Sequence, residues 1–389
     1  MIVFKAAQEQ VLSALQSVAG IVERRHTLPV LANVLMRKNG SALELTTSDL
    51  EIQVRTTAHL GGEETAFTTT VGARKMIDIL RTLPADQIVS LTASGSKLTL
   101  QGGKSRFTLQ TLPSEDFPLV NESVDFGTPF SIPQKTLKGL IDQVHFAMAV
   151  HDIRYYLNGI LFIAEGKTLT LVATDGHRLA LAQSPLDNEV PARQEVILPR
   201  KTVLELQRLL KADAQQEAKS AAADGVEGAE ASQSAAIEMK FAHNQAKFSF
   251  SGMEFVTKLV EGKFPDYNRV IPKNHKNSVT LGRQPLLSSL QRAAILTSEK
   301  FKGVRVNLEP GLLRIGASNA EQEEAKEEIE VDYEGDAIDI GFNVNYLIDA
   351  LANMDAEMVR IDLQDGNASA LITLPERPGF KYVVMPMRI

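Results

Sequence analysis

The 389-residue sequence contains no cysteine and no tryptophan. Without cysteine, disulfide bonds, cysteine-ligated zinc, iron–sulfur clusters and thiol catalysis are excluded. Aromatic residues make up only 6% of the chain, so large stacking platforms for single-stranded nucleic acid are not expected. No apolar run approaches the roughly 18 residues of a membrane span, and Lys5, Gln8 and Glu9 come too early for the apolar part of a secretory signal. We therefore expect a cytoplasmic protein with no membrane partner.

The remaining composition is that of an ordinary folded protein. Hydrophobic residues make up 44% of the chain and charged residues 23%, which argues against global disorder, a collagen or a coiled coil. The 41 lysines and arginines against 48 aspartates and glutamates give a net charge of −7, which argues against a generic nucleic-acid binder. At roughly 100 to 200 residues per domain, the length predicts two to four domains.

The sequence repeats itself. At an offset of 126 residues, Phe4 recurs as Phe130 and Asp49 as Asp175, together with many of the apolar positions around them. A third copy follows the second at an offset of 150 residues and then, after a loss of six, at 144. A constant offset over so long a stretch indicates three copies of one structural unit.

Each copy combines two amphipathic helix patterns with short strands of alternating polarity. In the first copy the second helix is expected over residues 73–83, and strands such as ALELTT and RFTLQTL are separated by glycine, serine or asparagine turns. We therefore predict an α+β fold of three repeated modules, at residues 1–125, 126–275 and 276–389, and the periodicity does not determine the sheet topology. The antiparallel sheets expected in each module follow only from the family resemblance described below. Residues 211–236 contain 10 alanines in 26 positions and no aromatic residue, which predicts a surface loop in the second module.

Several strings imitate catalytic motifs without the residues those motifs need. The GGKS string at 102–105 resembles the end of a phosphate-binding loop, but the glycine required five positions before Gly103 is Leu98, so a hairpin turn is predicted. The Asp-Phe-Gly string at 125–127 has no accompanying kinase elements and is interpreted as a linker between modules. The seven histidines lack metal-ligand spacing. We expect no catalytic site, metal or cofactor, and an enzyme whose site assembles only in space is the alternative.

Basic residues gather at the starts of predicted helices. Arg74 and Lys75 open the second helix of the first copy, and Arg200 and Lys201 occupy the same place in the second. Residues 321–330, in contrast, hold six glutamates against one lysine. This distribution favours binding a phosphate backbone through non-specific contacts on one face, although each basic pair taken alone could simply cover a solvated helix.

Longer segments resemble a known family. The segments TLPVLANVLM, RYYLNGILF, VATDGHRLALA, FPDYNRVIP, EKFKGVRV, IGFNVNYLIDAL and YVVMPMRI look like those of the bacterial DNA polymerase III β subunits, the β sliding clamps. The resemblance extends over the whole chain and departs at residues 211–236. It implies a closed ring of two chains joined head to tail, with helices lining the hole. Such a ring encircles duplex DNA without sequence preference, makes synthesis processive and has no catalytic activity.

The resemblance also implies partners. They are a second copy of the chain, duplex DNA, the catalytic subunit of the replicative polymerase, the ATP-driven clamp-loader complex, and other polymerases and repair proteins that carry short clamp-binding peptides. These peptides would begin with glutamine and end in leucine or phenylalanine. The alternative from another class is an open scaffold that binds DNA without encircling it.

Three sets of site residues follow from the resemblance. The residues expected to face DNA are Arg25, Arg74, Lys75, His151, Tyr155, Tyr156, Arg200 and Lys201. The residues expected to form a partner-peptide groove are Leu157, Thr174, Gly176, His177, Arg178, Leu179, Pro265, Arg269, Val270, Asn343, Tyr346, Val383, Met385, Pro386, Met387 and Arg388. The residues expected at the dimer interface are Lys104, Arg106, Phe107, Leu109, Ile295, Leu296, Glu323 and Glu327.

Residue patterns support parts of these sets and leave alternatives open. Alternation along RFTLQTL places Phe107 and Leu109 on one face of a strand, where the alternative is ordinary core. Ile295 and Leu296 are expected in the first helix of the third module. For Tyr155 and Tyr156, the alternative is that they begin a strand and pack on their own sheet.

The last residues have an unusual composition for a chain end. Pro386 cannot donate to a strand ladder, so the final four residues are expected to leave the sheet. Met385 and Met387 are adaptable side chains that suit a surface accepting several ligands. The alternative is a last edge strand that completes the core of the third module.

Overall fold

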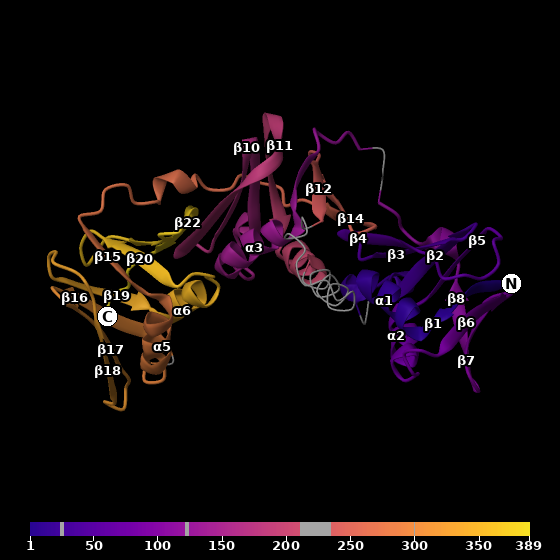
Figure 1. Ribbon diagram of the computed structural model, residues 1–389, viewed down its shortest axis with the longest axis horizontal. Coiled ribbons are helices and arrows are strands. Elements are labelled where there is room, and N and C mark those ends of the chain that lie inside the picture. The colour runs from indigo at the N-terminus through magenta and orange to yellow at the C-terminus, as the bar shows by residue number, and fades with distance from the viewer. Residues whose placement is uncertain (24–26, 121–123, 211–234, 299) are drawn as a thin grey trace, which may run out of the picture. The chain divides into compact units, whose positions relative to one another are not determined.

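A computed structural model describes residues 1–23, 27–120, 124–210, 235–298 and 300–389 (Figure 1). Arg25 of the expected DNA-facing set lies outside these residues, and so does the predicted loop up to residue 234. The predicted end of that loop is wrong by one residue, because Ala236 already begins a strand and pairs with Pro133. The chain forms two compact units, residues 1–134 with 204–259 and residues 135–203 with 260–389.

The first unit is built on one antiparallel sheet of twelve strands. In spatial order these are β1 (Ile2–Ala7), β6 (Ile88–Ser94), β7 (Lys97–Gly102), β8 (Ser105–Leu112), β5 (Phe67–Gly72), β2 (Asn33–Asn39), β3 (Ala42–Ser48), β4 (Ile52–Ala58), β14 (Met253–Lys258), β13 (Gln245–Phe250), β12 (Ala236–Phe241) and β9 (Phe130–Pro133). Its helices include α1 (Gln8–Val18) and α2 (Ala73–Arg81), with short 3₁₀ turns η1 (Ala19–Ile21), η2 (Pro29–Ala32) and η3 (Ser114–Asp116).

The second unit contains two antiparallel sheets. The six-stranded sheet runs β10 (Gly159–Thr174), β11 (Arg178–Pro199), β22 (Arg377–Val384), β21 (Ala370–Leu374), β20 (Met358–Leu363), β15 (Asn277–Gly282), and the four-stranded sheet runs β18 (Glu324–Glu330), β17 (Leu312–Ser318), β16 (Gly303–Glu309), β19 (Ile338–Asn343). Its helices are α3 (Gln134–Val144), which starts at the boundary, α5 (Arg283–Ala294) and α6 (Val344–Ala352), with η4 (His145–Ala147), η5 (Tyr155–Leu157) and η6 (Tyr267–Arg269). Residues 200–210, which are also helical, cross the boundary between the units.

The helices form where the apolar spacing predicts them. In α2 the side chains of Ala73, Met76, Ile77 and Leu80 are buried, which is the spacing of one helix face. Asn343 precedes α6, and its side chain accepts the backbone N–H of residue 345 and caps the helix start. Pairs of helices pack together in the first and third copies, α1 with α2 and α5 with α6.

The sheets continue from one predicted module into the next. β4 of the first copy pairs with β14, and β11 of the second copy pairs with β22. Because these ladders bond neighbouring modules as tightly as strands within a module, the compact units do not coincide with three equal parts. The module boundaries at 1–125, 126–275 and 276–389 therefore stay a prediction.

The two strings that imitate catalytic motifs have ordinary structures. Residues 102–105 form the predicted hairpin turn between β7 and β8, and Gly103 has a positive φ of 59°. Residues 125–127 lie in neither a helix nor a strand, and Gly127 donates its N–H to the carbonyl of Phe241 at 2.8 Å.

Candidate functional site: a groove at the ends of β11 and β22

A groove of about 200 Å³ opens in the second unit at the ends of strands β10, β11 and β22. Its floor is apolar, because Leu157, Leu179, Phe264 and Val383 are almost completely buried in one cluster. Most of the residues expected for the partner-peptide groove lie here. The residues that line the groove are Arg154, Leu157, Thr174, Gly176, His177, Arg178, Leu179, Phe264, Pro265, Asp266, Tyr267, Val270, Val383 and Met385.

A tight turn between β10 and β11 shapes one side of the groove. The Asp175 carboxylate accepts the backbone N–H groups of His177 at 2.9 Å and Arg178 at 3.1 Å, and the hydroxyl of Thr174 accepts that of Gly176 at 3.1 Å. Aspartate and threonine are well suited to such turns because their side chains bond the backbone two or three residues on. Gly176 has φ of 91°, which only glycine adopts without strain.

Arg178 connects the turn to α6 behind the groove. Its guanidinium donates to Asp175 at 3.1 Å and to Asp349 at 2.7 Å, and it lies 4.5 Å from the centre of the Tyr346 ring. Burial lowers the pKa of Arg178, but the hydrogen bond to Asp349 and the nearby carboxylates outweigh it, so the pKa is raised above its ordinary value. The guanidinium therefore stays charged, and because its side chain is only 10% exposed it fixes the position of the turn against α6.

The residues after β22 form the opposite side of the groove. Met385 donates its N–H to the carbonyl of His177 at 2.9 Å, and its side chain is 41% exposed. The ring of His177 stacks on Tyr346, with ring centres 6.4 Å apart. Val270 is 40% exposed and also lines the groove. The site therefore presents flexible apolar side chains to solvent over a fixed floor, a form that suits short apolar peptide segments.

Several expected groove residues lie beside the groove and do not line it. Arg269 pairs with Asp266 at 3.0 Å and is largely exposed. Asn343 caps α6, and Tyr346 lies under the guanidinium of Arg178. Pro386, Met387 and Arg388 continue past the groove after β22 has ended, which confirms that the last four residues leave the sheet.

Four residues that line the groove were not predicted. Phe264, Asp266 and Tyr267 belong to the FPDYNRVIP segment, so their neighbourhood to Pro265 could have indicated them. Arg154 is the fourth, and it is not among the residues expected for the groove. In the structure it bonds Asp152 at 3.0 and 2.8 Å. These hydrogen bonds lower the pKa of Asp152 to about 2.

Replacing Gly176 by alanine should destabilise the fold by about 1 kcal/mol, because the residue is held at positive φ. The new Cβ would also lie 3.2 Å from the Arg154 guanidinium, at the rim of the groove. Gly166→Ala is the matched control, since Gly166 has φ of 57° but open space around it. Both variants should unfold at lower urea concentration, and only Gly176→Ala should alter the groove. Equal ligand binding by the two variants would contradict this.

The predicted interface strand β8 has an open edge. β8 pairs along its length with β7, but β5 pairs only with its last two residues, Thr111 and Leu112. Phe107 and Leu109 are half-buried on one face, as the alternation predicts, while Lys104 and Arg106 are exposed. Among the described residues, β18 likewise pairs with β17 alone. Open strand edges of this kind are available for pairing with another chain.

Two expectations for the other side of that interface need correction. Ile295 and Leu296 do not lie in α5, which ends at Ala294, because backbone bonds to the third residue back tighten the chain there. Ile295 is nonetheless 77% exposed. Glu327 does not offer a free carboxylate, since Arg292 of the same chain donates to it at 2.9 and 2.5 Å.

Glu323 is also engaged within its own chain, as the acceptor of a hydrogen bond from the Asn319 side chain at 2.6 Å. The hydrogen bonds from Arg292 lower the pKa of Glu327. Both glutamates are therefore less available for ion pairs with a second chain than the sequence indicated. Apolar contact by Ile295 and Leu296 remains as the main expected contribution to this side of the interface.

The expected DNA-facing residues that the structure describes lie in both units. Arg74 and Lys75 lie exposed in the first turn of α2, and the Arg74 guanidinium donates to the carbonyl of Val22. Arg200 and Lys201 begin the helical residues 200–210. The structure therefore confirms their helix-start positions, and their contact with DNA stays a prediction.

His151 and the two tyrosines lie in the segment that leads to η5. His151 is exposed and has a positive φ of 55°. The alternative of a strand start is wrong for Tyr155 and Tyr156, because both lie in η5. Tyr155 is 57% exposed, while Tyr156 packs against the apolar cluster under the groove. Only Tyr155 of the two thus presents most of its ring to solvent.

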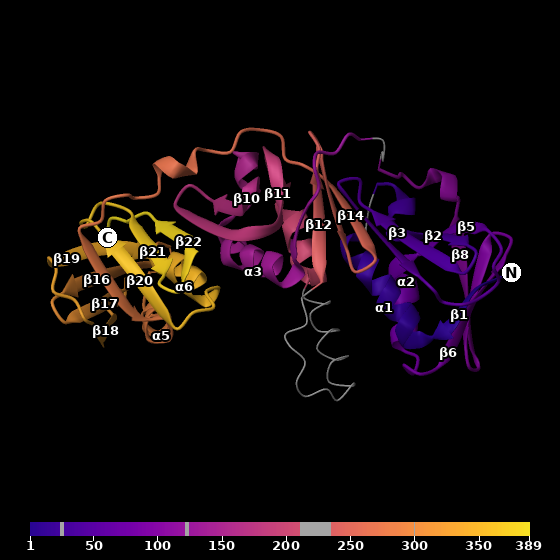
Figure 2. The same ribbon diagram turned by 45° about the horizontal axis from the view of Figure 1, so that its top comes forward.

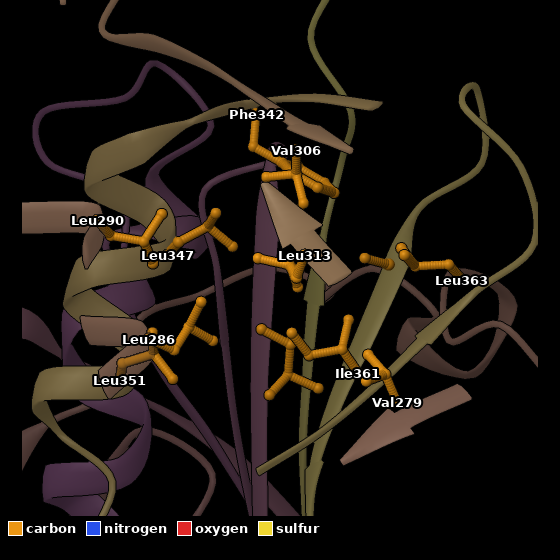
Figure 3. Close-up of a pocket in the computed structure, with 12 residues that line it drawn as sticks. Val279, Leu286, Leu290, Val306, Leu313, Phe342, Leu347, Leu351, Ile361 and Leu363 are labelled. Carbon is orange, nitrogen blue, oxygen red and sulfur yellow. The ribbon is translucent and has the colours of Figure 1, made fainter. Parts of the chain in front are cut away.

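A second cavity is a gap in packing. It measures about 30 Å³ and lies in the core of the third copy, where Leu286 and Leu290 of α5 and Leu347 and Leu351 of α6 face the sheets (Figure 3). Every lining side chain is apolar, so the cavity offers a ligand no hydrogen bond. In the part of the chain that the structure describes, no group of three potential metal ligands occurs. No helix among the same residues is long and apolar enough to cross a bilayer.

Comparison with known proteins identifies the family. The family models of the DNA polymerase III beta subunit match three successive segments, with the N-terminal domain at residues 2–121, the central domain at 131–266 and the C-terminal domain at 268–388. The chain belongs to the DNA polymerase III beta subunit family. The predicted resemblance and the α+β fold of three beta-subunit domains are thereby confirmed.

Relatives of this beta subunit match it from end to end. It is 44% identical to the beta sliding clamp of Pseudomonas aeruginosa over 388 residues, 99% of this chain and 100% of the relative. It is 39% identical to that of Escherichia coli K12 over 386 residues, with the same coverage. A crystal structure of the Pseudomonas aeruginosa sliding clamp bound to griselimycin matches with a TM-score of 0.91 at 43% identity, covering 100% of both chains. A Caulobacter crescentus clamp matches with a TM-score of 0.89 at 31% identity, covering 100% of this chain and 99% of the other.

Proposed function

We propose that this chain is a DNA sliding clamp that makes DNA synthesis processive and has no catalytic activity. Two copies close head to tail into a ring around duplex DNA, which the ring holds without sequence preference, and the ring tethers the replicative polymerase. The observation that carries this proposal is the match of all three beta-subunit domains, in order, over nearly the whole chain. The open edges of β8 and β18 support a chain that pairs with itself.

Retention on circular DNA tests the encircling ring. The protein is placed on a nicked circular plasmid with a clamp-loader complex and ATP, and free protein is removed by gel filtration. A ring should stay on the circle and be lost when the same plasmid is then cut once, because it slides off the ends. Equal retention on circular and linear DNA would indicate the alternative, an open scaffold held by contact alone.

The groove at the ends of β11 and β22 is our proposed docking site for partners. These would be the polymerase catalytic subunit, the clamp loader, and other polymerases and repair proteins that carry short clamp-binding peptides. The buried apolar floor and the exposed methionine support a peptide ligand. The griselimycin complex of the Pseudomonas aeruginosa clamp supplies a probe for this chain. We place the protein in the cytoplasm, on the nucleoid during replication.

Neutralising four basic residues should weaken DNA binding. Arg74→Gln, Lys75→Gln, Arg200→Gln and Lys201→Gln together should flatten the dependence of log affinity on log salt, by about 0.9 units of slope for each phosphate that the protein no longer neutralises. The dimer should persist, since none of the four lies on β8 or β18. The control combines Arg193→Gln with Arg314→Gln, two arginines held in ion pairs on strands. If the slope were the same in both proteins, these four side chains would not contact DNA.

A further inference from the structure

The residues after β22 are held at two points beyond the strand. Met385 donates to the carbonyl of His177, and two residues later Met387 donates its N–H to the carbonyl of Gly341 in β19 at 2.8 Å. The chain then runs along β16 and β19, where both views place its end (Figures 1 and 2). The segment that carries the groove residue Met385 is therefore fixed at the turn between β10 and β11 and at β19 of the four-stranded sheet.

Two glycines leave room for this segment on the surface of the four-stranded sheet. In the ladder of β16 and β19, Gly303 pairs with Asn343, and Arg305 pairs with Gly341. Side chains alternate between the two faces of these strands, and Val304, next to Gly303, is buried in the core. Both glycines therefore lie on the opposite, outer face. Neither glycine has a positive φ. Their backbone would accept another residue, and what distinguishes them is the missing side chain.

The last residues occupy the space that those side chains would fill. A Cβ at position 341 would lie 2.4 Å from the backbone oxygen of Met387 and 2.7 Å from the side chain of Ile389. A Cβ at position 303 would lie 3.2 Å from Ile389 and 3.5 Å from the sulfur of Met387. The Arg305 guanidinium also donates to the backbone oxygen of Ile389 at 3.4 Å. The first contact is with backbone and too close for any real structure, so the segment would have to move.

We propose that Gly303 and Gly341 form a seat for residues 387–389, and that this seat positions Met385 as a wall of the partner groove. The two glycines are positioning residues, because neither lines the groove. The inference rests on the proposed function of the groove as a peptide-docking site. It assigns a role to two residues of β16 and β19, remote in sequence from the groove floor, in setting the affinity of that site.

Graded substitutions test the seat, with griselimycin as the probe. Gly341→Ala should weaken binding about tenfold, because the displaced segment no longer holds the apolar wall in place. Gly303→Ala should weaken it about twofold to threefold, since there the contact is only slightly too close. Gly316→Ala is the matched control. It lies on the neighbouring strand β17, and a Cβ there would meet only the carbonyl of residue 325 at 4.0 Å. The affinity of Gly316→Ala for griselimycin should equal that of the native protein.

A label reports on the segment independently of binding. Because the chain has no cysteine, Arg388→Cys offers a single site for a nitroxide. The label should be restrained in the otherwise native protein and in Gly316→Ala, and mobile in Gly341→Ala. Two results in Gly341→Ala would contradict the proposed seat. One is a restrained label, and the other is a mobile label together with unchanged griselimycin affinity. Failure of the native protein to bind griselimycin would instead count against the docking function, while the label would still show whether the seat exists.

Discussion

Replacing Ile295 and Leu296 together by alanine should yield folded monomers. Ile295 is 77% exposed at the end of α5, next to the open edge strand β18 in the third copy. An isoleucine so exposed contributes little to its own core, so its loss should fall on association with a second chain. Surface ion pairs at the rim contribute only about 0–1 kcal/mol each, and Glu327 is already paired with Arg292. Sedimentation should give a mass near 42.5 kDa, where the native protein gives twice that.

Phe301→Ala is the control for this experiment. Phe301 is 57% exposed and follows the same helix by a few residues, but it is not among the expected interface residues. This variant should sediment as the native dimer does. Dimers of the Ile295→Ala, Leu296→Ala protein at submicromolar concentration would contradict the assignment, provided that its circular dichroism matches that of the native protein.

Replacing Arg178 by alanine should destabilise the second unit and damage the groove. The substitution leaves the carboxylates of Asp175 and Asp349 without their common partner. Losing one member of a buried pair costs about 3–5 kcal/mol, and here we expect about 2–3 kcal/mol because the side chain of Asp349 is 43% exposed. The turn that presents His177 would also lose its connection to α6. Urea unfolding and griselimycin titration should both show a loss.

Arg193→Ala provides the comparison for this effect. Arg193 is also held by two carboxylates, at 3.1 and 2.8 Å, but its side chain is 47% exposed. Its loss should change stability by less than about 1 kcal/mol and leave the groove intact. Similar losses in the two variants would show that burial of Arg178 is not what makes it important.

The repeated architecture could be predicted because it depends on patterns within short stretches. The apolar spacing of α2 and the Asp49 and Asp175 turns are each encoded over a few residues, and the offset of 126 then relates them. The end of α5 was predicted wrongly by a residue or two, since tightening of a last turn leaves little trace in apolar spacing. Helix ends are set by local backbone bonds that several sequences can make.

Ion pairs between residues far apart in the chain could not be predicted from the sequence patterns. Arg178 and Asp349 are 171 residues apart, and Arg292 and Glu327 are 35 apart. Nothing in the spacing of charges shows which carboxylate an arginine meets once the sheets have formed. For the same reason Glu327 was expected to serve a second chain. Most residues that line the groove were predicted. The family resemblance assigned them, and the spacing of residues in the sequence did not.

The turn after β10 has a counterpart after β3. There Asp49 accepts the backbone N–H groups of residues 51 and 52 at 2.9 and 2.6 Å, and Leu50 holds the positive φ, 75°, that belongs to Gly176 in the second copy. The backbone N–H of Lys258 donates to the carbonyl of Glu51 at 2.8 Å, just as the backbone N–H of Met385 donates to the carbonyl of His177.

The two copies therefore share a scaffold and differ in the side chains mounted on it. Where the second copy has Gly176, His177 and Arg178, the first has Leu50, Glu51 and Ile52. The hydrogen bonds of this turn are therefore the same in the first two copies, while the residues between them differ. Leu50 holds, without being a glycine, the left-handed conformation that Gly176 holds in the second copy, so one backbone turn presents an apolar side chain in the first copy and lines the partner groove in the second.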